Sequence, residues 1–264
     1  MRAFDRLCRA IHELSQSLSA FIYHYGIAEG IALNTGTPAI AIDDFFYYCL
    51  AKGSKHIRAA MVLVENELPE DAIVVSRAAY ECYVCAAYAI AHGTKAIDDL
   101  VYNPVGLDAG TVEYARTKTG KWNYRQLVDK ATETVFDAPP SIERMVLSTG
   151  YTDDAVVHRH YYGFSSQHAH VNMAGSGNYR DGAAYTDHGN GQRQNAIFLA
   201  GYVTAVIVAM AIENTDMDGR EKARIAKELR IAVRQINEVL DKHFKELADD
   251  FVAAVRSRLG LVLG

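Results

Sequence analysis

The strongest constraint on this fold is a stretch of 17 residues without a charged side chain, Ala196–Ile212. A segment of this kind has to be removed from water, and its length is at the lower limit for crossing a bilayer. Its alanines, together with Gly201, Tyr202 and Thr204, make it only moderately apolar. We therefore predict a helix buried at the centre of a bundle, with a membrane span as the alternative.

Apolar residues recur at helical spacing along most of the 264-residue chain, and few stretches alternate between polar and apolar as strands do. Turn signals such as Asn34–Pro38 and Leu68–Pro69 separate the helical stretches. The pattern predicts an all-α, multi-helix bundle that forms a single helical domain over residues 1–264. The predicted helices cover residues 3–25, 40–66, 70–92, 110–135, 140–148, 152–172, 193–214 and 217–259.

The final segment predicts a long C-terminal helix within residues 216–259, because apolar residues follow spacings of three and four along it. Two spacings of four occur in succession between Ile236 and Phe244, which disfavours an ideal two-stranded coiled coil. We expect this helix to lie along the bundle, to form a homodimer interface or to contact a protein partner.

Charge and cysteine content predict a cytoplasmic protein that does not associate with a membrane. Asp5, Arg6 and Arg9 interrupt the apolar core that an N-terminal secretory signal requires. Four cysteines are too few for a disulfide scaffold, and they suit a reducing compartment. The formal net charge of -5 argues against a surface that is basic throughout, although a local basic face is compatible with it.

Several chemistries lack their sequence signatures. The chain contains no phosphate-binding P-loop motif, no G-x-S-x-G elbow, no H-E-x-x-H and no glutamate three residues before a histidine. Cys82-x-x-Cys85 stands alone in an apolar helix, which is more typical of buried thiols than of a zinc or redox site. We therefore predict no metal and no cofactor.

A pair of opposite charges interrupts the apolar run of residues 72–92, where Arg77 and Glu81 lie four residues apart on one helix face. Burial of two ions costs several kcal/mol per ion unless they bond to each other and to further groups. The pair is therefore either an internal ion pair that fixes the packing of the helix, or the lining of a cleft in which an arginine binds phosphate or carboxylate.

Residues 158–172 carry four histidines together with tyrosines and serines, directly before the glycine-rich segment 174–192. Tyr162, Ser166 and His170 follow a four-residue spacing and form one stripe on a helix. No two histidines are four residues apart, so a compact histidine metal site within this helix is disfavoured. The stripe indicates either proton transfer near neutral pH or histidines that pack between helices. The glycine-rich segment is either a binding loop or disordered.

The pattern Ser76-Arg77-x-x-x-Glu81, followed by Tyr162-x-x-x-Ser166-x-x-x-His170, resembles a bacterial all-α family catalogued as a domain of unknown function. The resemblance covers roughly residues 40–215 and implies a helical fold, but no activity. A more distant comparison is with the HEPN-type helical ribonucleases, whose signature is Arg, four to six residues, then His. Only Arg6 and His12 meet that spacing here. The positions that match the uncharacterised family are Arg77, Glu81, Tyr162, Ser166 and His170.

The last helix also carries a basic stretch, since residues 220–234 hold six basic and two acidic side chains. Such a stretch is either an ordinary solvated face or a contact for RNA or another polyanion, which would bind without sequence preference and with strong salt dependence. The residues that we assign to a polyanion contact are Arg220, Arg224, Lys227 and Arg234.

Two functions follow from these patterns. The first is a metal-independent, ribonuclease-like or phosphate-ester-acting effector of a toxin or phage-defence system. In it His170 is a general acid or base, Arg77 stabilises charge that develops on phosphate, and Glu81 orients Arg77 or a histidine, while Tyr162 and Ser166 position the substrate. The alternative is a non-catalytic interaction or ligand-sensing module, in which the same cluster is structural or binds a small anion.

Overall fold

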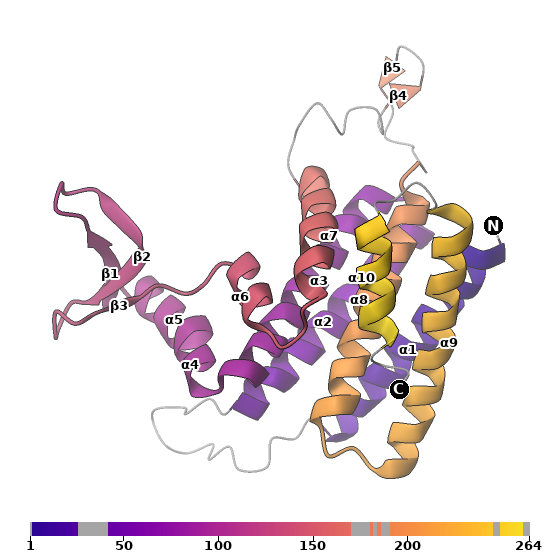
Figure 1. Cartoon of the computed structure of the whole chain (residues 1–264), viewed down its shortest axis with the longest axis horizontal. Helices are drawn as coiled ribbons and strands as arrows, with labels where there is room; N and C mark the ends of the chain where they lie inside the picture. The colour runs from indigo at the N-terminus through magenta and orange to yellow at the C-terminus, as the bar shows by residue number, and fades with distance from the viewer. Residues whose placement is uncertain are drawn as a thin grey trace. The chain divides into compact units, whose positions relative to one another are not determined.

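The computed structural model describes residues 2–25, 42–169, 191–244 and 249–260, together with residues 180–181 and 184–185. Helices dominate the described residues, so the predicted all-α, multi-helix bundle is confirmed (Figure 1). The helices are α1 (Arg2–Tyr25), α2 (Ile42–Glu65), α3 (Pro69–His92), α4 (Thr94–Ile97), the π-helix η1 (Asp98–Tyr102), α5 (Asn103–Asp108), α6 (Ile142–Ser148), α7 (Asp154–Ala169), α8 (Arg193–Asn214), α9 (Gly219–His243) and α10 (Asp249–Gly260).

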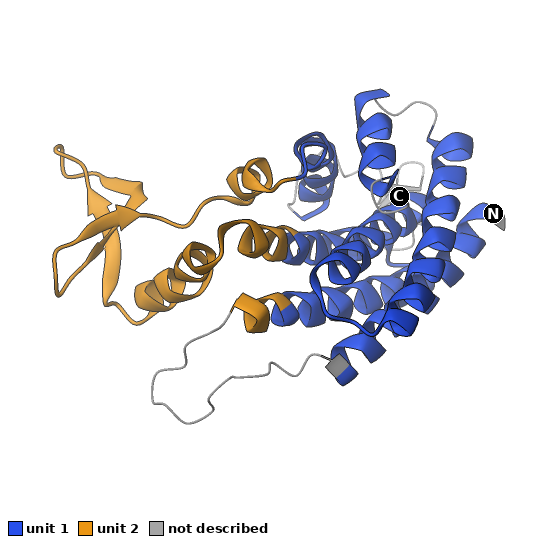
Figure 2. Ribbon diagram, turned by 60° about the horizontal axis from the view of Figure 1, so that its bottom comes forward, with its two compact units in different colours: residues 1–27, 47–83, 151–264 blue, residues 28–46, 84–150 orange. Residues whose placement is uncertain are grey.

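Contacts divide the chain into two compact units, which Figure 2 shows in different colours. Unit 1 comprises residues 1–27, 47–83 and 151–264, and unit 2 comprises residues 28–46 and 84–150. Each unit is built from segments that are distant in sequence. A single domain over residues 1–264 stays a prediction.

The core of unit 1 forms where α1, α8 and α9 pack against one another. Apolar residues on α1 recur at spacings of three and four, which places them on one face of the helix. That face is buried, whereas the charged residues Asp5, Arg6, Arg9 and Glu13 of α1 are exposed. The buried α1 side chains include Phe4, Leu7, Ile11, Leu14, Leu18 and Phe21.

The uncharged helix α8 lies inside this bundle, and every residue from Ala196 to Ala211 is buried. The prediction of a central buried helix is therefore confirmed. Both α3 and α8 have the length and apolar composition needed to cross a membrane, and 61% and 89% of their most apolar windows are buried in the structure. Core helices of soluble proteins meet the same criterion, so the absence of a membrane and the cytoplasmic location stay predictions.

The single helix that we predicted over residues 217–259 is wrong, because two helices occupy this region. The first, α9, ends at His243, and α10 begins at Asp249. Because the apolar spacing slips between Ile236 and Phe244, a straight helix would rotate its later apolar residues away from the bundle. The break allows α10 to pack against α7.

Unit 2 contradicts the predicted helix over residues 110–135. This region folds into an antiparallel sheet of β1 (Val112–Arg116), β2 (Trp122–Asp129) and β3 (Val135–Asp137), in that order. Aromatic and β-branched residues are frequent in these strands and favour extended backbone. Turn chemistry separates the strands: Gly120 has a φ of 80°, and the Asp129 carboxylate accepts hydrogen bonds from the N–H groups of Ala131 and Thr132.

The glycine-rich segment 174–192 falls largely outside the described residues. Two short strands within it, β4 (Arg180–Asp181) and β5 (Ala184–Tyr185), pair in antiparallel fashion.

Close packing of α8 on α1 makes Gly201 a sensitive position. A Cβ at residue 201 would lie 3.2 Å from Cδ1 of Leu7 and 3.4 Å from Cδ1 of Ile11. We expect Gly201→Val to lower the free energy of unfolding by about 1–3 kcal/mol, as overpacking does in other cores, and urea unfolding measures this change. Gly163→Ala on α7 is the control: its Cβ meets no atom within 4 Å, and higher helix propensity should stabilise it by up to about 1 kcal/mol. A Gly201→Val protein as stable as wild type would contradict this packing.

Candidate functional site

Helices α3 and α7 bring together three residues that we predicted for the site. The Nε group of Arg77 donates a hydrogen bond to Oε1 of Glu81 at 3.1 Å, and its Nη2 group donates to the hydroxyl of Tyr162 at 2.5 Å. The guanidinium carbon also lies 4.2 Å from the centroid of the Tyr162 ring. Arg77 and Tyr162 are 85 residues apart in sequence. We call these three residues the Arg77 cluster.

The Arg77 cluster lies at the edge of the core of unit 1. The side chain of Arg77 is 19% exposed and that of Glu81 is 36% exposed. Burial, and secondarily the Glu81 charge, raise the pKa of Tyr162, although Arg77 opposes this shift. The Tyr162 phenol therefore stays protonated near neutral pH, so it can accept a hydrogen bond from Arg77 and still donate its own. The cluster combines a cation, a carboxylate and a hydroxyl within reach of solvent.

His158 belongs beside this cluster, although we did not select it from the sequence. Its ring stacks on Tyr162 with centroids 4.7 Å apart, and it also stacks on Tyr80 at 5.9 Å. A usable signal was present, because His158 extends the four-residue spacing of Tyr162, Ser166 and His170 by one turn towards the N-terminus of α7. The aromatic stack holds the Tyr162 ring in place from the side of the core.

Ser166 is half-buried and lies one turn beyond Tyr162 on α7. His170, our predicted general acid or base, lies outside the described residues. Tyr161 and Ser165, which each directly precede a residue of the predicted stripe, have structural roles. Both side chains are buried, and their hydroxyls donate hydrogen bonds to the backbone carbonyls of Ser76 at 3.1 Å and of Tyr161 at 2.8 Å respectively.

A second arginine in unit 1, Arg258 of α10, is fully buried with Asp154 and Tyr83. The Tyr83 hydroxyl donates to Oδ2 of Asp154 at 2.5 Å, and Nε and Nη2 of Arg258 both donate to that hydroxyl at 3.2 Å. The side chains of Arg258 and Asp154 are 0% and 2% exposed, and Arg258 also stacks on the ring of Tyr151 at 3.8 Å. Sequence analysis missed this network, although Arg258 follows Phe251 and Val255 at the spacing of the buried face of α10.

Burial raises the pKa of Asp154 to about 6, although Arg258 and the hydrogen bond from Tyr83 act in the opposite direction. The buried ions tie α3, α7 and α10 together, and removal of one partner leaves the other charge uncompensated in the core. The network is closed to solvent, so its geometry indicates a structural role.

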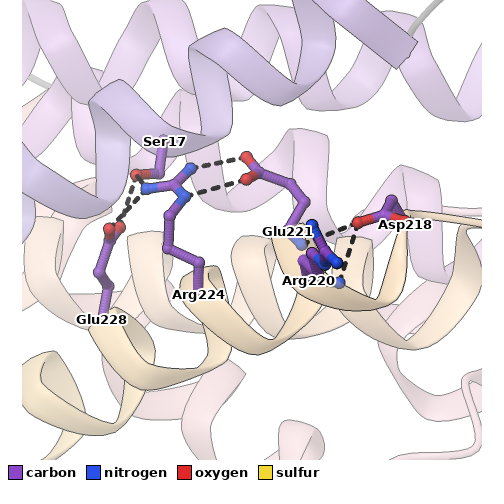
Figure 3. Close-up of polar contacts among 6 residues, drawn as sticks. All are labelled: Ser17, Asp218, Arg220, Glu221, Arg224 and Glu228. Carbon is purple, nitrogen blue, oxygen red and sulfur yellow. Dashed lines mark hydrogen bonds and ion pairs between the residues drawn. The ribbon is translucent and has the colours of Figure 1, made fainter.

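The basic residues that we assigned to a polyanion contact all lie on α9 and are exposed. Arg224 is already occupied, as Figure 3 shows: its guanidinium binds Glu221 at 2.6 Å, Glu228 at 2.7 Å and the hydroxyl of Ser17 at 3.0 Å. This network fastens α9 to α1 and compensates the charge of Arg224. A polyanion contact through α9 stays a prediction, and it would depend mainly on Arg220, Lys227 and Arg234.

Within the described ranges, no group of three or more His, Cys, Asp or Glu side chains is placed to hold a metal ion. Cys82 is buried, and burial raises the pKa of its thiol to about 11. The thiolate, which is the reactive form, is therefore disfavoured at this cysteine.

The sequence model of DUF5677, a family of unknown function, matches residues 43–189, which is more than half of the chain. The chain belongs to DUF5677. The resemblance that we inferred from short motifs is therefore confirmed at the level of an uncharacterised family. The part of the chain that matches DUF5677 contains Arg77, Glu81, Tyr162, Ser166 and His170. No curated protein and no solved structure matches the chain.

The raised pKa of Asp154 predicts a pH dependence of the stability of this DUF5677 member. Between pH 4 and 6 the folded protein holds a proton on Asp154 that the unfolded chain releases, because the pKa is about 6 in place of 3.8. Stability should therefore fall as pH rises from 4 to 7, by about 2 kcal/mol relative to Asp154→Asn, which does not titrate. Urea unfolding of both proteins at pH 4 and pH 7 tests this; a constant or opposite difference would refute the shift.

Proposed function

We propose that this DUF5677 member is a metal-independent, ribonuclease-like enzyme that acts on phosphate esters. The observation that carries the proposal is the contact between Arg77 and Tyr162, which holds a partly exposed guanidinium between two helices. A guanidinium that is fixed in advance can stabilise charge as it develops on a phosphate, since it needs little reorganisation during the reaction. Arg77 has five N–H donors, and the bonds to Glu81 and Tyr162 engage only two of its nitrogens.

The chemistry assigned to the site is transesterification of RNA. A base removes the proton from a 2′-hydroxyl, and the resulting oxygen attacks the adjacent phosphorus. The bond from phosphorus to the 5′-oxygen breaks, and that oxygen takes up a proton. The products are a 2′,3′-cyclic phosphate and a 5′-hydroxyl, so no metal, oxidant or second substrate is required.

Roles within the Arg77 cluster follow from charge and geometry. Arg77 binds the phosphate oxygens and stabilises the transition state. Glu81 orients Arg77 through their ion pair, and the protonated Tyr162 hydroxyl positions the same phosphate. His170 keeps the role of general acid or base that the sequence suggested, and Ser166 contacts the substrate. All five positions lie within the part of the chain that matches DUF5677.

A non-catalytic anion-sensing module is the second candidate, and the ion pair between Arg77 and Glu81 favours it. A guanidinium already bonded to a carboxylate has lower affinity for a further anion, because Glu81 compensates part of its charge. In that case the site binds a small anion reversibly and causes no cleavage.

The cellular setting is also a proposal. We infer a cytoplasmic homodimer that does not associate with a membrane and acts as a toxin or phage-defence effector. Exposed basic residues of α9 would supply nonspecific contacts with RNA, and the C-terminal helices could bind a protein partner. The distant HEPN comparison suggests ribonuclease chemistry, but the proposal does not depend on that comparison.

The decisive assay incubates the purified protein with total RNA in the presence of EDTA. We expect cleavage in wild type and a decrease of about 100-fold or more in Arg77→Gln and His170→Ala, since loss of one group that stabilises the transition state has effects of this size. Tyr162→Phe removes a single hydroxyl and should lower the rate by a smaller factor. Each variant should retain its helical circular dichroism.

Arg159→Gln is the matched control. Arg159 lies on the same helix as Tyr162, is 66% exposed and pairs only with the exposed Asp250 among the described residues. Its replacement should leave cleavage unchanged. Cleavage that is equal in wild type, Arg77→Gln and His170→Ala would place the activity elsewhere, and dependence on a divalent metal would refute the metal-independent mechanism. Anion binding that needs Arg77, without cleavage, would establish the sensing module.

A further inference from the structure

Unit 2 contains a groove of about 740 Å³, and its lining includes no residue of the Arg77 cluster or of the predicted α9 face. One wall is the middle of β2, and another is the segment from the end of β3 into α6. The groove is open to solvent, and its lining is mostly polar. The lining residues that matter most here are Lys95, Asn123, Tyr124, Arg125, Asp137 and Arg144.

An irregularity in the sheet directs β2 side chains into this groove. Tyr114 of β1 pairs with Leu127, but the next residue, Ala115, pairs with Asn123. The three residues between these pairs, Tyr124, Arg125 and Gln126, therefore have no partner on β1 and bulge out of the ladder. Such bulges bend a strand and redirect its side chains, often beside a functional site.

Hydrogen bonds hold the bulge in one conformation. The Asn123 side chain accepts a hydrogen bond from the Arg125 N–H at 3.1 Å and donates one to Gln126 at 2.9 Å. The carbonyl of Arg125 accepts a hydrogen bond from the N–H of Ala138 at 2.9 Å, which links the two walls of the groove. The groove is thus built from defined backbone contacts.

The charges in the groove leave two arginines available. Lys95 is paired with the buried carboxylate of Asp99 at 2.7 Å, and Tyr88 donates a hydrogen bond to the same carboxylate. In contrast, Arg125 and Arg144 are exposed, and neither forms an ion pair with any residue that the structure describes. Asp137 is the acidic residue in the lining. Two exposed arginines against one carboxylate favour an anionic ligand.

Aromatic rings lie beside these charges. Tyr124 is 69% exposed and contacts the ring of Tyr114 edge to face at 5.0 Å. Trp122, two residues earlier on β2, is 42% exposed and is covered on one side by the guanidinium of Arg116 at 3.8 Å. Exposed rings next to basic side chains are typical of surfaces that stack bases and track a phosphate backbone.

We propose that this groove binds a segment of single-stranded RNA. Arg125 and Arg144 contact consecutive phosphates, and Tyr124 stacks on a base. The choice of RNA rests on the ribonuclease function proposed above, and the groove deepens that function by recruiting the substrate to unit 2. The bulge presents one arginine, for a phosphate, and one tyrosine, for the face of a base. We therefore expect binding with little sequence preference and strong salt dependence.

Binding can be measured independently of cleavage with a fluorescein-labelled oligouridylate of 12 nucleotides that carries 2′-O-methyl groups. This probe lacks the attacking hydroxyl, so cleavage by transesterification is impossible. Fluorescence anisotropy of the full-length protein gives the affinity. Trp122 is the only tryptophan in the chain, so quenching of its intrinsic fluorescence reports binding at this sheet alone.

We expect Arg125→Gln and Arg144→Gln each to weaken binding by about tenfold and to make it less dependent on salt. Tyr124→Ala should weaken it by about 5- to 100-fold through lost stacking. Lys130→Gln is the control, because Lys130 belongs to the same region, pairs with Glu113 at 3.5 Å and does not line the groove. It should bind like wild type.

Unchanged affinity in the Arg125→Gln/Arg144→Gln double variant would overturn this inference, as would failure of the wild type to bind. The inference would also be overturned if uridine monophosphate or inorganic phosphate displaced the oligonucleotide at concentrations similar to that of the oligonucleotide itself. The ligand would then be a small phosphate. Groove binding without RNA cleavage would refute only the proposed catalytic function. Cleavage that is insensitive to Arg125 and Arg144 would refute only the groove.

Discussion

Burial of α8 is the constraint on which the rest of unit 1 depends. This helix carries no charge from Ala196 to Ile212, so neighbouring helices have to cover it on all sides. The amphipathic helices α1 and α9 each contribute one apolar face to this cover. The network of Arg224, Glu221, Glu228 and Ser17 fastens these two helices to each other. The hydroxyls of Tyr161 and Thr204, which are buried in this core, donate hydrogen bonds to the backbone carbonyls of Ser76 and Ala200.

Unit 1 uses the same three chemical groups twice, in two different settings. Arg258, Asp154 and Tyr83 form a fully buried set, whereas Arg77, Glu81 and Tyr162 form a partly exposed one. In the buried set the groups compensate one another and stabilise the packing of three helices. In the exposed set the guanidinium is held in place but can still be reached by a ligand. Exposure, rather than residue type, separates the structural arginine from the candidate functional one.

Periodicity and charge were sufficient to predict most helices of unit 1 and to assign Arg77 and Tyr162 to the same candidate site. They failed over residues 110–135, because a short sheet with a bulge leaves only weak alternation and its aromatic residues also occur in helices. They failed again at His243, where tertiary packing ends a helix that local propensity would continue. The pairing of Asp154 with Arg258 was not identified, since the spacing along α10 can mark Arg258 as buried but does not indicate its distant partner.

The central claim is that Arg77 and Tyr162 act as one unit on a phosphate ester. A double-mutant cycle of Arg77→Gln and Tyr162→Phe, measured as single-turnover RNA cleavage, tests it most directly. We predict that the loss of activity in the double variant is smaller than the two single losses combined, because Tyr162 both contacts the phosphate and holds the guanidinium that binds it. Strictly additive losses, or wild-type rates in both single variants, would contradict the claim.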